Sequence, residues 1–520
     1  MNDFINKMGE YWSQLSFDKL GDILTYHHNA PILFSSGLFF FLFIGFLIIY
    51  MSLRKHLLTR IIYVTLFSIY FYYKSSGLFF FLLLFVATSD FCIAQCMTKT
   101  ASKWGRKAWV VLSLCVDLGL LGYFKYFNFL REIMAAVAHE LGYQLGNTSL
   151  QNITYQPLDI FLPVGISFFT FQTISYVIDV YRGRIAPLRR WIDYVFYVSF
   201  FPQLVAGPIV RARDFIPQIR QNPIVVTREM FGTGVFLILT GLFKKAIISD
   251  YISLNFVDRI FDEPLLYSGF ECLAGIYGYA LQIYCDFSGY SDMAIGIALL
   301  LGFRFPKNFD APYKSATITE FWRRWHISLS TWLRDYLYIS LGGNRKGRIR
   351  TYFNLLVTML LGGLWHGAAV RFILWGALHG IALALHKLWL SVVPGSKATG
   401  AEMRWFWRIP GIFFTFNLVC FGWLMFRAES MKTVQLMLHQ IFTNFNPSVI
   451  PQVLEGYAGI FLLVGIGYLL HMLPDRCDRW AQRFVTSLPT VVQVLLAACV
   501  IWLVMQVKSS DIQPFIYFQF

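Results

Sequence analysis

The stretch PILFSSGLFFFLFIGFLIIYM, residues 31–51, decides the class of fold. It carries no charged side chain, and a helix of about 20 residues, rising 1.5 Å per residue, crosses a hydrocarbon core of about 30 Å. The stretch therefore predicts a first membrane span. Further apolar segments follow near residues 61–73, 77–96, 108–127, 159–180, 193–209, 230–248, 270–301, 353–365, 371–392, 410–427, 456–472 and 488–507.

Several of these segments are short or interrupted by glycine. Lipid offers no hydrogen bonds to a broken backbone, so such a segment is tolerated at membrane depth only inside protein or beside a wet cavity. We therefore expect an all-α fold, a polytopic transmembrane helical bundle in which some segments re-enter the membrane without crossing it.

The composition of the whole chain agrees with a lipid-embedded protein. Of the 520 residues, 57% are hydrophobic and 14% are charged, and an ordinary soluble domain carries about 25% charged residues. The mean hydropathy of +0.54 excludes a soluble globule, because so many apolar side chains cannot be hidden from water. The aromatic content of 18% excludes a disordered chain.

The net charge of +15 would suggest a nucleic-acid partner in a soluble protein. Here the cations lie in short loops between apolar runs, which is the pattern of cytoplasmic loops in a multi-span membrane protein. We therefore expect no nucleic-acid partner. The eight cysteines are scattered and predict neither a disulfide framework nor a zinc site.

The loop charges also predict an orientation. Two lysines and four acidic residues precede residue 31, a net charge of −2, whereas Arg54, Lys55 and Arg60 follow the first span. The N-terminus is therefore expected outside, with the basic loops Lys99–Lys107, Arg182–Arg190 and Arg345–Arg350 in the cytoplasm.

The domain organisation is simple. Residues 1–30 form a predicted extracytoplasmic N-terminal segment, either a short amphipathic helix or an ordered tail, and residues 31–520 form one membrane domain. No cleavable signal peptide and no internal repeat is evident in the sequence.

Ionisable residues within apolar segments are functional candidates, because burying them in a membrane is costly. In YCDFSGYSD, residues 284–292, Asp286 and neighbouring hydroxyls interrupt an apolar run, and glycine permits close helix approach. These polar groups either hold helices together by hydrogen bonds or, in the case of Asp286, contribute to substrate binding.

A second polar segment spans residues 319–338 and contains His326. Thr319 is a residue type typical of a helix start, and Glu320 and Arg324 have the i,i+4 spacing of an ion pair on one helix face. The tryptophans suit either an interfacial anchor or a cavity wall. The imidazole can exchange a proton near neutral pH, and we expect its aromatic and cationic neighbours to hold an acyl donor. These candidate binding residues are Trp322, Arg323, Arg324 and Trp325.

The third candidate is His366 in LGGLWHG, residues 361–367, next to Trp365. Three glycines are expected to loosen the helix here and let the ring reach a cavity. The alternative is a buried histidine satisfied by a carbonyl group. His379 lies 13 residues on, about 220° around a continuous helix, and is interpreted as structural. No ligand-spaced cluster is present, so no catalytic metal is expected.

Five sequence blocks point to a known family. QIYCDFSGYSDMAIG (282–296), ITEFWRRWHISLSTWLRDYLYISLGGNRKG (318–347) and LGGLWHG (361–367) closely resemble the membrane-bound O-acyltransferases, in particular their bacterial alginate O-acetylation branch. FLPVGISFFTFQTISYVIDVYRG (161–183) and FPQLVAGPIVR (201–211) are similar to earlier blocks of that branch. The resemblance begins near Leu33 and reaches the C-terminus.

This resemblance implies a helical bundle pierced by a funnel or tunnel, with the family's signature histidine, here His366, at its constriction. It implies that His366 is the general base, that His326 orients the donor or relays a proton, and that Trp365 belongs to the binding site. No bound cofactor is implied, and the acetyl donor is expected to be acetyl-CoA on the cytoplasmic side.

The implied setting is the bacterial cytoplasmic (inner) membrane, with an exported polysaccharide such as alginate as the acceptor. The implied partner is an extracytoplasmic acetyltransferase or polysaccharide-assembly protein. Peptidoglycan or teichoic-acid O-acylation is an alternative within the family. A proton-coupled transporter of an acyl carrier is an alternative of another class, but the sequence lacks the repeated halves that are common in transporters. A docking scaffold is a further alternative, but docking alone does not require the two motif histidines.

Overall fold

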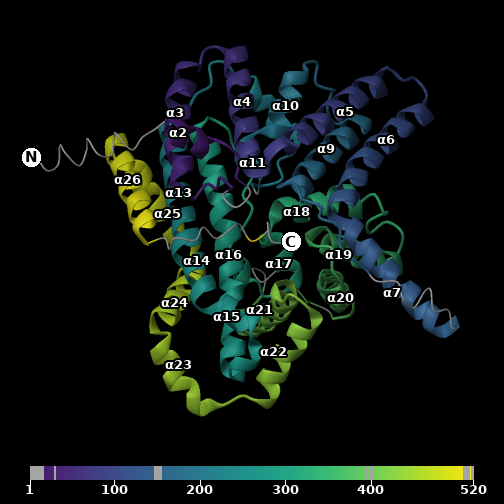
Figure 1. The fold of residues 1–520 in the computed structure, drawn as a ribbon, viewed down its shortest axis with the longest axis vertical. Coiled ribbons are helices and arrows are strands. Elements are labelled where there is room, and N and C mark those ends of the chain that lie inside the picture. The colour runs from purple at the N-terminus through teal and green to yellow at the C-terminus, as the bar shows by residue number, and fades with distance from the viewer. Residues whose placement is uncertain are drawn as a thin grey trace, which may run out of the picture.

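The computed structural model describes residues 17–27, 31–145, 155–205, 207–393, 395–396, 403–507 and 516. Within these ranges the chain forms helices and connecting loops and no strand (Figure 1). The predicted all-α fold is therefore confirmed. Of the predicted N-terminal segment 1–30, only residues 17–27 are described, and they contain the short helix α2.

The helices follow one another along the chain in four groups. The first group is α2 (Phe17–Leu24), α3 (Gly37–Ser52), α4 (Leu57–Ser76), α5 (Phe80–Lys99), α6 (Lys103–Leu121) and α7 (Phe127–Leu145). The second is α9 (Ile166–Tyr181), α10 (Trp191–Ser199), α11 (Phe201–Leu204), α12 (Ala212–Ile219), α13 (Arg228–Leu242), α14 (Asp250–Ile252), α15 (Asp258–Asp262) and α16 (Gly269–Leu300). The third is α17 (Ile318–Arg324), α18 (Ile327–Trp332), α19 (Arg348–His366) and α20 (Val370–Val392). The fourth is α21 (Trp405–Arg427), α22 (Met431–Thr443), α23 (Ile450–Gly456), α24 (Ala458–Met472), α25 (Asp475–Ser487) and α26 (Thr490–Val507).

Five helical stretches among the described residues are long and apolar enough to cross a membrane, and seven if each of two bent helix pairs counts as one span. The bent pairs are α23 with α24, at 89°, and α25 with α26, at 116°. The five stretches are Leu57–Lys99, Lys103–Gln144, Arg228–Asp262, Val370–Val392 and Trp405–Arg427. The chain is a multi-pass membrane protein, and its broken helices agree with the predicted irregular segments.

The first predicted span, residues 31–51, is only partly helical. The helix begins at Gly37, because the Ser36 side chain caps it by accepting a hydrogen bond from the Phe39 amide at 3.2 Å. The resulting helix α3 has 16 residues, fewer than the roughly 20 that a perpendicular span requires. A polar cap inside the apolar run therefore shortened the helix relative to the prediction.

Hydrogen bonds connect the predicted basic loops to one another or to residues close to them. Arg106 donates to the carbonyl oxygen of Tyr181 at 3.1 Å, which joins the first loop to the second. Arg182 donates to the carbonyl oxygen of Asp335 at 3.2 Å and to Ser340 Oγ at 2.9 Å, close to where the third loop begins. The prediction that these loops share a side agrees with these contacts.

The N-terminal segment lies at the opposite end of α4 from Arg60. Arg60, in the first turn of α4, donates to the carbonyl oxygen of Arg54 at 2.8 Å, in the basic stretch that follows α3. Lys74, in the last turn, donates to the carbonyl oxygen of Ile23 at 2.9 Å. Helix α2 and the cationic stretch after α3 therefore lie at opposite ends of α4.

The centre of the molecule is a close crossing of α13 and α16, which lie side by side (Figure 1). A Cβ atom built on Gly234 would lie 2.8 Å from the carbonyl oxygen of Gly296, and one on Gly241 would lie 2.5 Å from that of Gly289. Only hydrogen fits between the two backbones at these points. The predicted close helix approach at Gly289 is confirmed.

Helices α19 and α20 form a second close pair. A Cβ atom on Gly363 would lie 2.2 Å from the carbonyl oxygen of Phe372, and one on Gly376 would lie 2.4 Å from that of Met359. The prediction that three glycines loosen the helix around His366 holds only for Gly367, where α19 ends; the helix continues unbroken through Gly362 and Gly363. Gly363 instead lets α20 approach.

Candidate active site

His366 is the last residue of α19, and its side chain is buried. The centroid of its ring lies 4.9 Å from that of Trp365, 5.0 Å from that of Trp375 and 5.2 Å from that of Phe426. The last two rings meet it nearly edge to face, at 84° and 73°. Aromatic residues of α20 and α21 therefore enclose the imidazole on sides that α19 leaves open.

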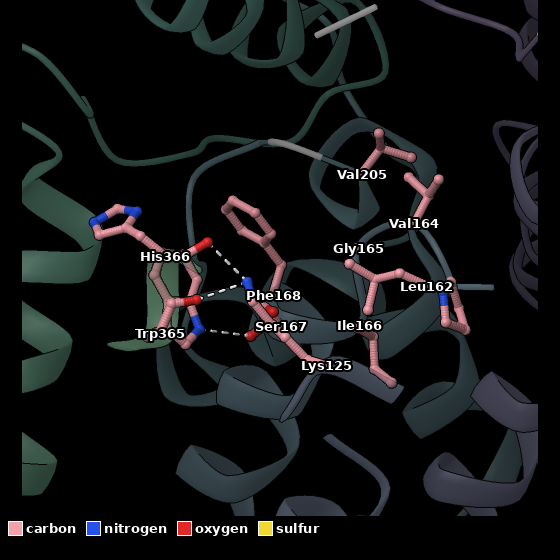
Figure 2. A pocket seen from close by; sticks show the side chains of 11 residues that line it. Lys125, Leu162, Val164, Gly165, Ile166, Ser167, Phe168, Val205, Trp365 and His366 are labelled. Atoms are coloured by element: carbon pink, nitrogen blue, oxygen red, sulfur yellow. Dashed lines mark hydrogen bonds between the residues drawn. The ribbon is translucent and has the colours of Figure 1, made fainter. Parts of the chain in front are cut away.

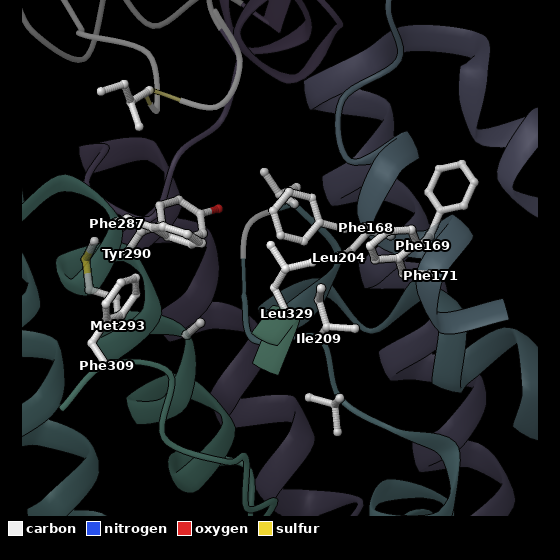
Figure 3. Close-up of a cluster of buried hydrophobic side chains, with 14 of the residues drawn as sticks. Phe168, Phe169, Phe171, Leu204, Ile209, Phe287, Tyr290, Met293, Phe309 and Leu329 are labelled. Atoms are coloured by element: carbon white, nitrogen blue, oxygen red, sulfur yellow. The ribbon is translucent and has the colours of Figure 1, made fainter. Parts of the chain in front are cut away.

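His326 lies at the junction of α17 and α18, where it is fully buried in a left-handed backbone conformation with φ of +42°. Such a conformation is uncommon outside glycine and often marks a functional constraint. It breaks the helix so that the ring faces Phe287, at 4.6 Å and 85°. Figure 3 shows Phe287 and Phe168, another ring contact of His326 at 6.5 Å, within one buried apolar cluster.

Asn308 determines which nitrogen of His326 carries the proton. The Asn308 Oδ1 atom accepts hydrogen bonds from the Ser328 amide at 3.2 Å and the Ser328 hydroxyl at 2.9 Å, so it is an acceptor. It lies 3.2 Å from His326 Nδ1, which therefore acts as the donor. In the neutral ring the basic lone pair is then on Nε2.

Trp365 joins the two histidines. Its ring centroid lies 6.3 Å from that of His326 and 4.9 Å from that of His366. Its indole N–H donates to the carbonyl oxygen of Ser167 at 3.3 Å, and its ring stacks on Phe171 at 5.2 Å and 17°. The structure therefore brings two of the predicted site residues, His326 and His366, together around a third, Trp365, which is anchored to α9.

His379 extends this row of rings. It accepts a hydrogen bond at Nδ1 from the indole N–H of Trp322 at 3.3 Å, and its ring lies 4.7 Å from that of Trp375. Trp375 in turn contacts His366, so the predicted site residue Trp322 is linked to His366 through two other rings. The predicted rotation between His366 and His379 does not apply, because the chain leaves the helix at Gly367 and begins α20 at Val370.

The two predicted binding arginines, Arg323 and Arg324, do not belong to the row of rings around the histidines. Arg324 pairs with Glu320 at 3.0 Å, as predicted, and with Asp310 at 3.4 Å, whereas Arg323 is exposed. Burial by itself raises the pKa of Asp310, but the charges of Lys307 and Arg324 outweigh burial and lower this pKa below its ordinary value. Arg324 is thus engaged with two carboxylates, while the rings described above surround His326.

The predicted start of this helix is wrong, and one further predicted site residue lies at a helix contact. The helix cap is Thr317, not Thr319, because the Thr317 hydroxyl accepts the Glu320 amide at 3.1 Å. Trp325 packs its ring at 4.8 Å from that of Trp423 on α21. Trp325 is 1% exposed, and its role in binding the acyl donor stays a prediction.

Asp286 belongs to a separate buried ion cluster. It pairs with Lys245, which also contacts Asp250 at 2.8 Å, and it accepts the backbone amide of Ile516 at 3.0 Å. These contacts give Asp286 a structural role, and its role in substrate binding stays a prediction. The next residue, Phe287, is the one that reaches His326.

A small pocket with a cavity volume of about 50 Å³ borders His366 (Figure 2). Its wall includes Lys125 of the α6–α7 connection, Ser167 and Phe168 of α9, and Trp365. Within the described residues, no group of three histidine, cysteine or acidic side chains lies close enough to hold a metal ion. A continuous tunnel through the molecule stays a prediction.

Sequence reasoning missed four neighbours of the histidines: Lys125, Asn308, Trp375 and Phe426. An asparagine in the loop before α17 and a lysine in an apolar span are detectable in the sequence as polar residues in unusual places. The sequence does not show that Asn308 pairs with His326, 18 positions away, or that Lys125 pairs with His366, 241 positions away.

Comparison with known proteins supplies the chemical class. Residues 190–430 match the membrane-bound O-acyltransferase family. The chain is 39% identical over 443 residues to a probable alginate O-acetylase of Pseudomonas putida, covering 81% of this chain and 85% of that protein. It is 40% identical over 421 residues to a probable alginate O-acetylase of Pseudomonas aeruginosa, covering 79% and 75%. It is 35% identical over 452 residues to a peptidoglycan O-acetyltransferase of Helicobacter pylori, covering 81% of each chain.

Proposed function

Because this chain belongs to the membrane-bound O-acyltransferase family and is an O-acyltransferase, we propose that it serves the O-acetylation of an exported polysaccharide such as alginate. In this proposal an acetyl group passes from acetyl-CoA in the cytoplasm across the membrane, and an extracytoplasmic acetyltransferase or assembly protein assists its delivery. The alginate O-acetylase names of the Pseudomonas relatives support this acceptor.

The observation that carries the proposal is the position of His366 relative to the basic loops. Helix α19 begins at Arg348, within the stretch predicted as the third basic loop, and its 19 residues end at His366. At 1.5 Å per residue the histidine lies about 27 Å along the helix from that loop. A base at this depth suits transfer between a donor on one side of the membrane and an acceptor on the other.

The chemistry requires one base and a dry site. His366 accepts the proton of the attacking hydroxyl, the oxygen bonds to the acyl carbon, and the carbon–sulfur bond breaks. The imidazolium then returns its proton to the departing thiolate, so the histidine is regenerated. The aromatic wall of Trp365, Trp375 and Phe426 excludes water, which would otherwise hydrolyse the thioester.

His326 is proposed to support this reaction without being the essential base. We expect His326→Asn to retain partial activity and His366→Asn to retain none, because an asparagine at 326 still offers an N–H group to Asn308 Oδ1. The measurement is the acetyl-transfer rate in membranes at matched protein amounts. His439→Asn, on the exposed face of α22, serves as the control. Equal and complete loss in both site variants would show that the two histidines act as one unit.

The acceptor is tested by mass spectrometry of exported and cell-surface polysaccharides from cells with and without this chain. Loss of O-acetyl esters from an exported polysaccharide on deletion supports the proposal. Peptidoglycan is the second candidate acceptor, because the Helicobacter pylori relative is a peptidoglycan O-acetyltransferase. Loss of acetyl esters from peptidoglycan alone would favour that acceptor, and unchanged esters in every polymer would reject both.

The proposed orientation places the basic loops in the cytoplasm and α2 outside. In a background without the native cysteines, we expect Lys346→Cys to resist an impermeant thiol reagent in intact cells and Gly21→Cys to react rapidly. Both positions are exposed, and a Cβ atom at Gly21 meets no other atom within 4 Å. Gly347 is avoided because its φ of +86° disfavours any other residue. The reverse labelling pattern would invert the orientation and move the donor side.

A further inference from the structure

One turn of π-helix, Gly122–Tyr126, interrupts the long span that includes α6 and α7. Such insertions change the direction of side chains locally and are frequent at functional sites. Here the interruption directs two consecutive side chains, Lys125 and Tyr126, toward the end of another helix. That helix is α19, which ends at His366.

Both side chains donate hydrogen bonds to the final carbonyl groups of α19. Lys125 Nζ donates to the carbonyl oxygen of Trp365 at 2.8 Å and to that of His366 at 2.9 Å, as Figure 2 shows. The Tyr126 hydroxyl donates to the carbonyl oxygen of Leu364 at 2.9 Å. Three successive carbonyl groups are thereby satisfied from a segment about 240 residues away in sequence.

The end of α19 needs such donors. The last four carbonyl groups of a helix have no amide partner within the helix, and Gly367 leaves α19 in an extended conformation with φ of −163°. At membrane depth water is scarce, so an unsatisfied carbonyl is costly. A cation is also favourable at this end, because the helix dipole places partial negative charge there.

We infer that Lys125 is a positioning residue for His366, whose backbone it holds beside the pocket. The inference rests on the proposed role of His366 as the base. The carbonyl group that Lys125 binds is covalently attached to the Cα of that histidine, so a shift of the cap moves the ring. Lys125 also lines the same pocket as His366. A base displaced by about 1 Å can lose about 10²-fold in rate.

The test compares three variants with the wild-type chain in purified, full-length protein supplied with acetyl-CoA and an acceptor. Lys125→Met keeps a side chain of similar length and removes the ammonium group. We expect its kcat to fall about 10- to 100-fold while the KM for acetyl-CoA stays within about twofold of the wild-type value. Lys125→Arg keeps charge and donors and should recover most of the lost kcat. Lys103→Met, at an exposed position in the same span, should leave kcat unchanged.

A second measurement separates this inference from the proposed function. Hydrogen–deuterium exchange of peptides covering residues 361–369 should become faster in Lys125→Met and stay at the wild-type rate in Lys103→Met. Unchanged exchange overturns the inference whatever substrate the wild-type chain uses, and so does a wild-type kcat or an effect on KM alone. The wild-type chain could also fail to transfer acetyl groups while Lys125→Met still speeds exchange of residues 361–369. That result would reject acetyl-CoA as the donor and leave the hydrogen bonds from Lys125 to the end of α19 supported.

Discussion

His366→Ala is expected to abolish acyl transfer while the protein still inserts into the membrane. A positioned general base typically contributes about 10²- to 10⁴-fold to a rate, and the rings of Trp365, Trp375 and Phe426 around His366 supply no other base. The fold should tolerate the change, because α19 keeps its carbonyl bonds to Lys125 and its glycine contacts with α20. The measurement is the rate of O-acetyl ester formation in membranes at matched protein amounts.

The control for this prediction is His439→Ala, which removes an exposed imidazole from α22. His366→Gln provides a second site variant that fills more of the space between Trp365 and Trp375. Wild-type ester formation in either His366 variant would contradict its role as the base. Loss of protein from the membrane in the alanine variant alone would identify a packing defect, and the glutamine variant would then decide the catalytic question.

Gly289→Val is expected to prevent α13 and α16 from packing and to eliminate most folded protein. A Cβ atom at this position would lie 2.7 Å from the carbonyl oxygen of Gly241 and 3.1 Å from the amide nitrogen of Lys245. Backbone atoms cannot rotate away as a flexible side chain can. The cost should therefore reach about 3 kcal/mol, the upper part of the range for overpacked cores. The measurement is the yield and melting temperature of detergent-extracted protein in size-exclusion chromatography.

A matched substitution tests whether any glycine replacement has this effect. A Cβ atom at Gly119 in α6 meets no other atom within 4 Å, so Gly119→Val should retain near-normal yield. Gly241→Val, on the opposing helix, should reproduce the loss, because its Cβ would lie 2.5 Å from the carbonyl oxygen of Gly289. A normal melting temperature for Gly289→Val would show that the two helices separate without cost.

The sequence was sufficient for properties that depend on local composition. Hydropathy identified a multi-pass helical protein, because each apolar run must satisfy its own backbone in lipid. The spacing of Glu320 and Arg324 predicted their ion pair, and the basic loops were assigned to a shared side. His326 and His366 were recognisable as costly residues at depth, and the structure places both beside Trp365.

Helix limits were less accurate where one polar contact decides them. Ser36 shortened the first span by capping α3, and Thr317 rather than Thr319 began α17. The glycines before His366 were interpreted as a point of weakness, yet they permit the tight pairing of α19 and α20. In each case the helix limit or contact depended on which neighbouring group the residue contacted. The local sequence pattern was compatible with more than one such contact.

Only the tertiary structure decided which distant residues form the site. The sequence pattern predicted Asp286 as a site residue, and in the structure it pairs with Lys245. The pattern did not predict Asn308 or Lys125, yet Asn308 contacts the His326 ring and Lys125 contacts the backbone of His366. Helical periodicity determines which face of one segment is apolar, and loop charge determines its side of the membrane. The partner of a buried polar group is instead selected by how whole helices pack, and that selection depends on backbone distances of a few ångströms between segments far apart in the chain.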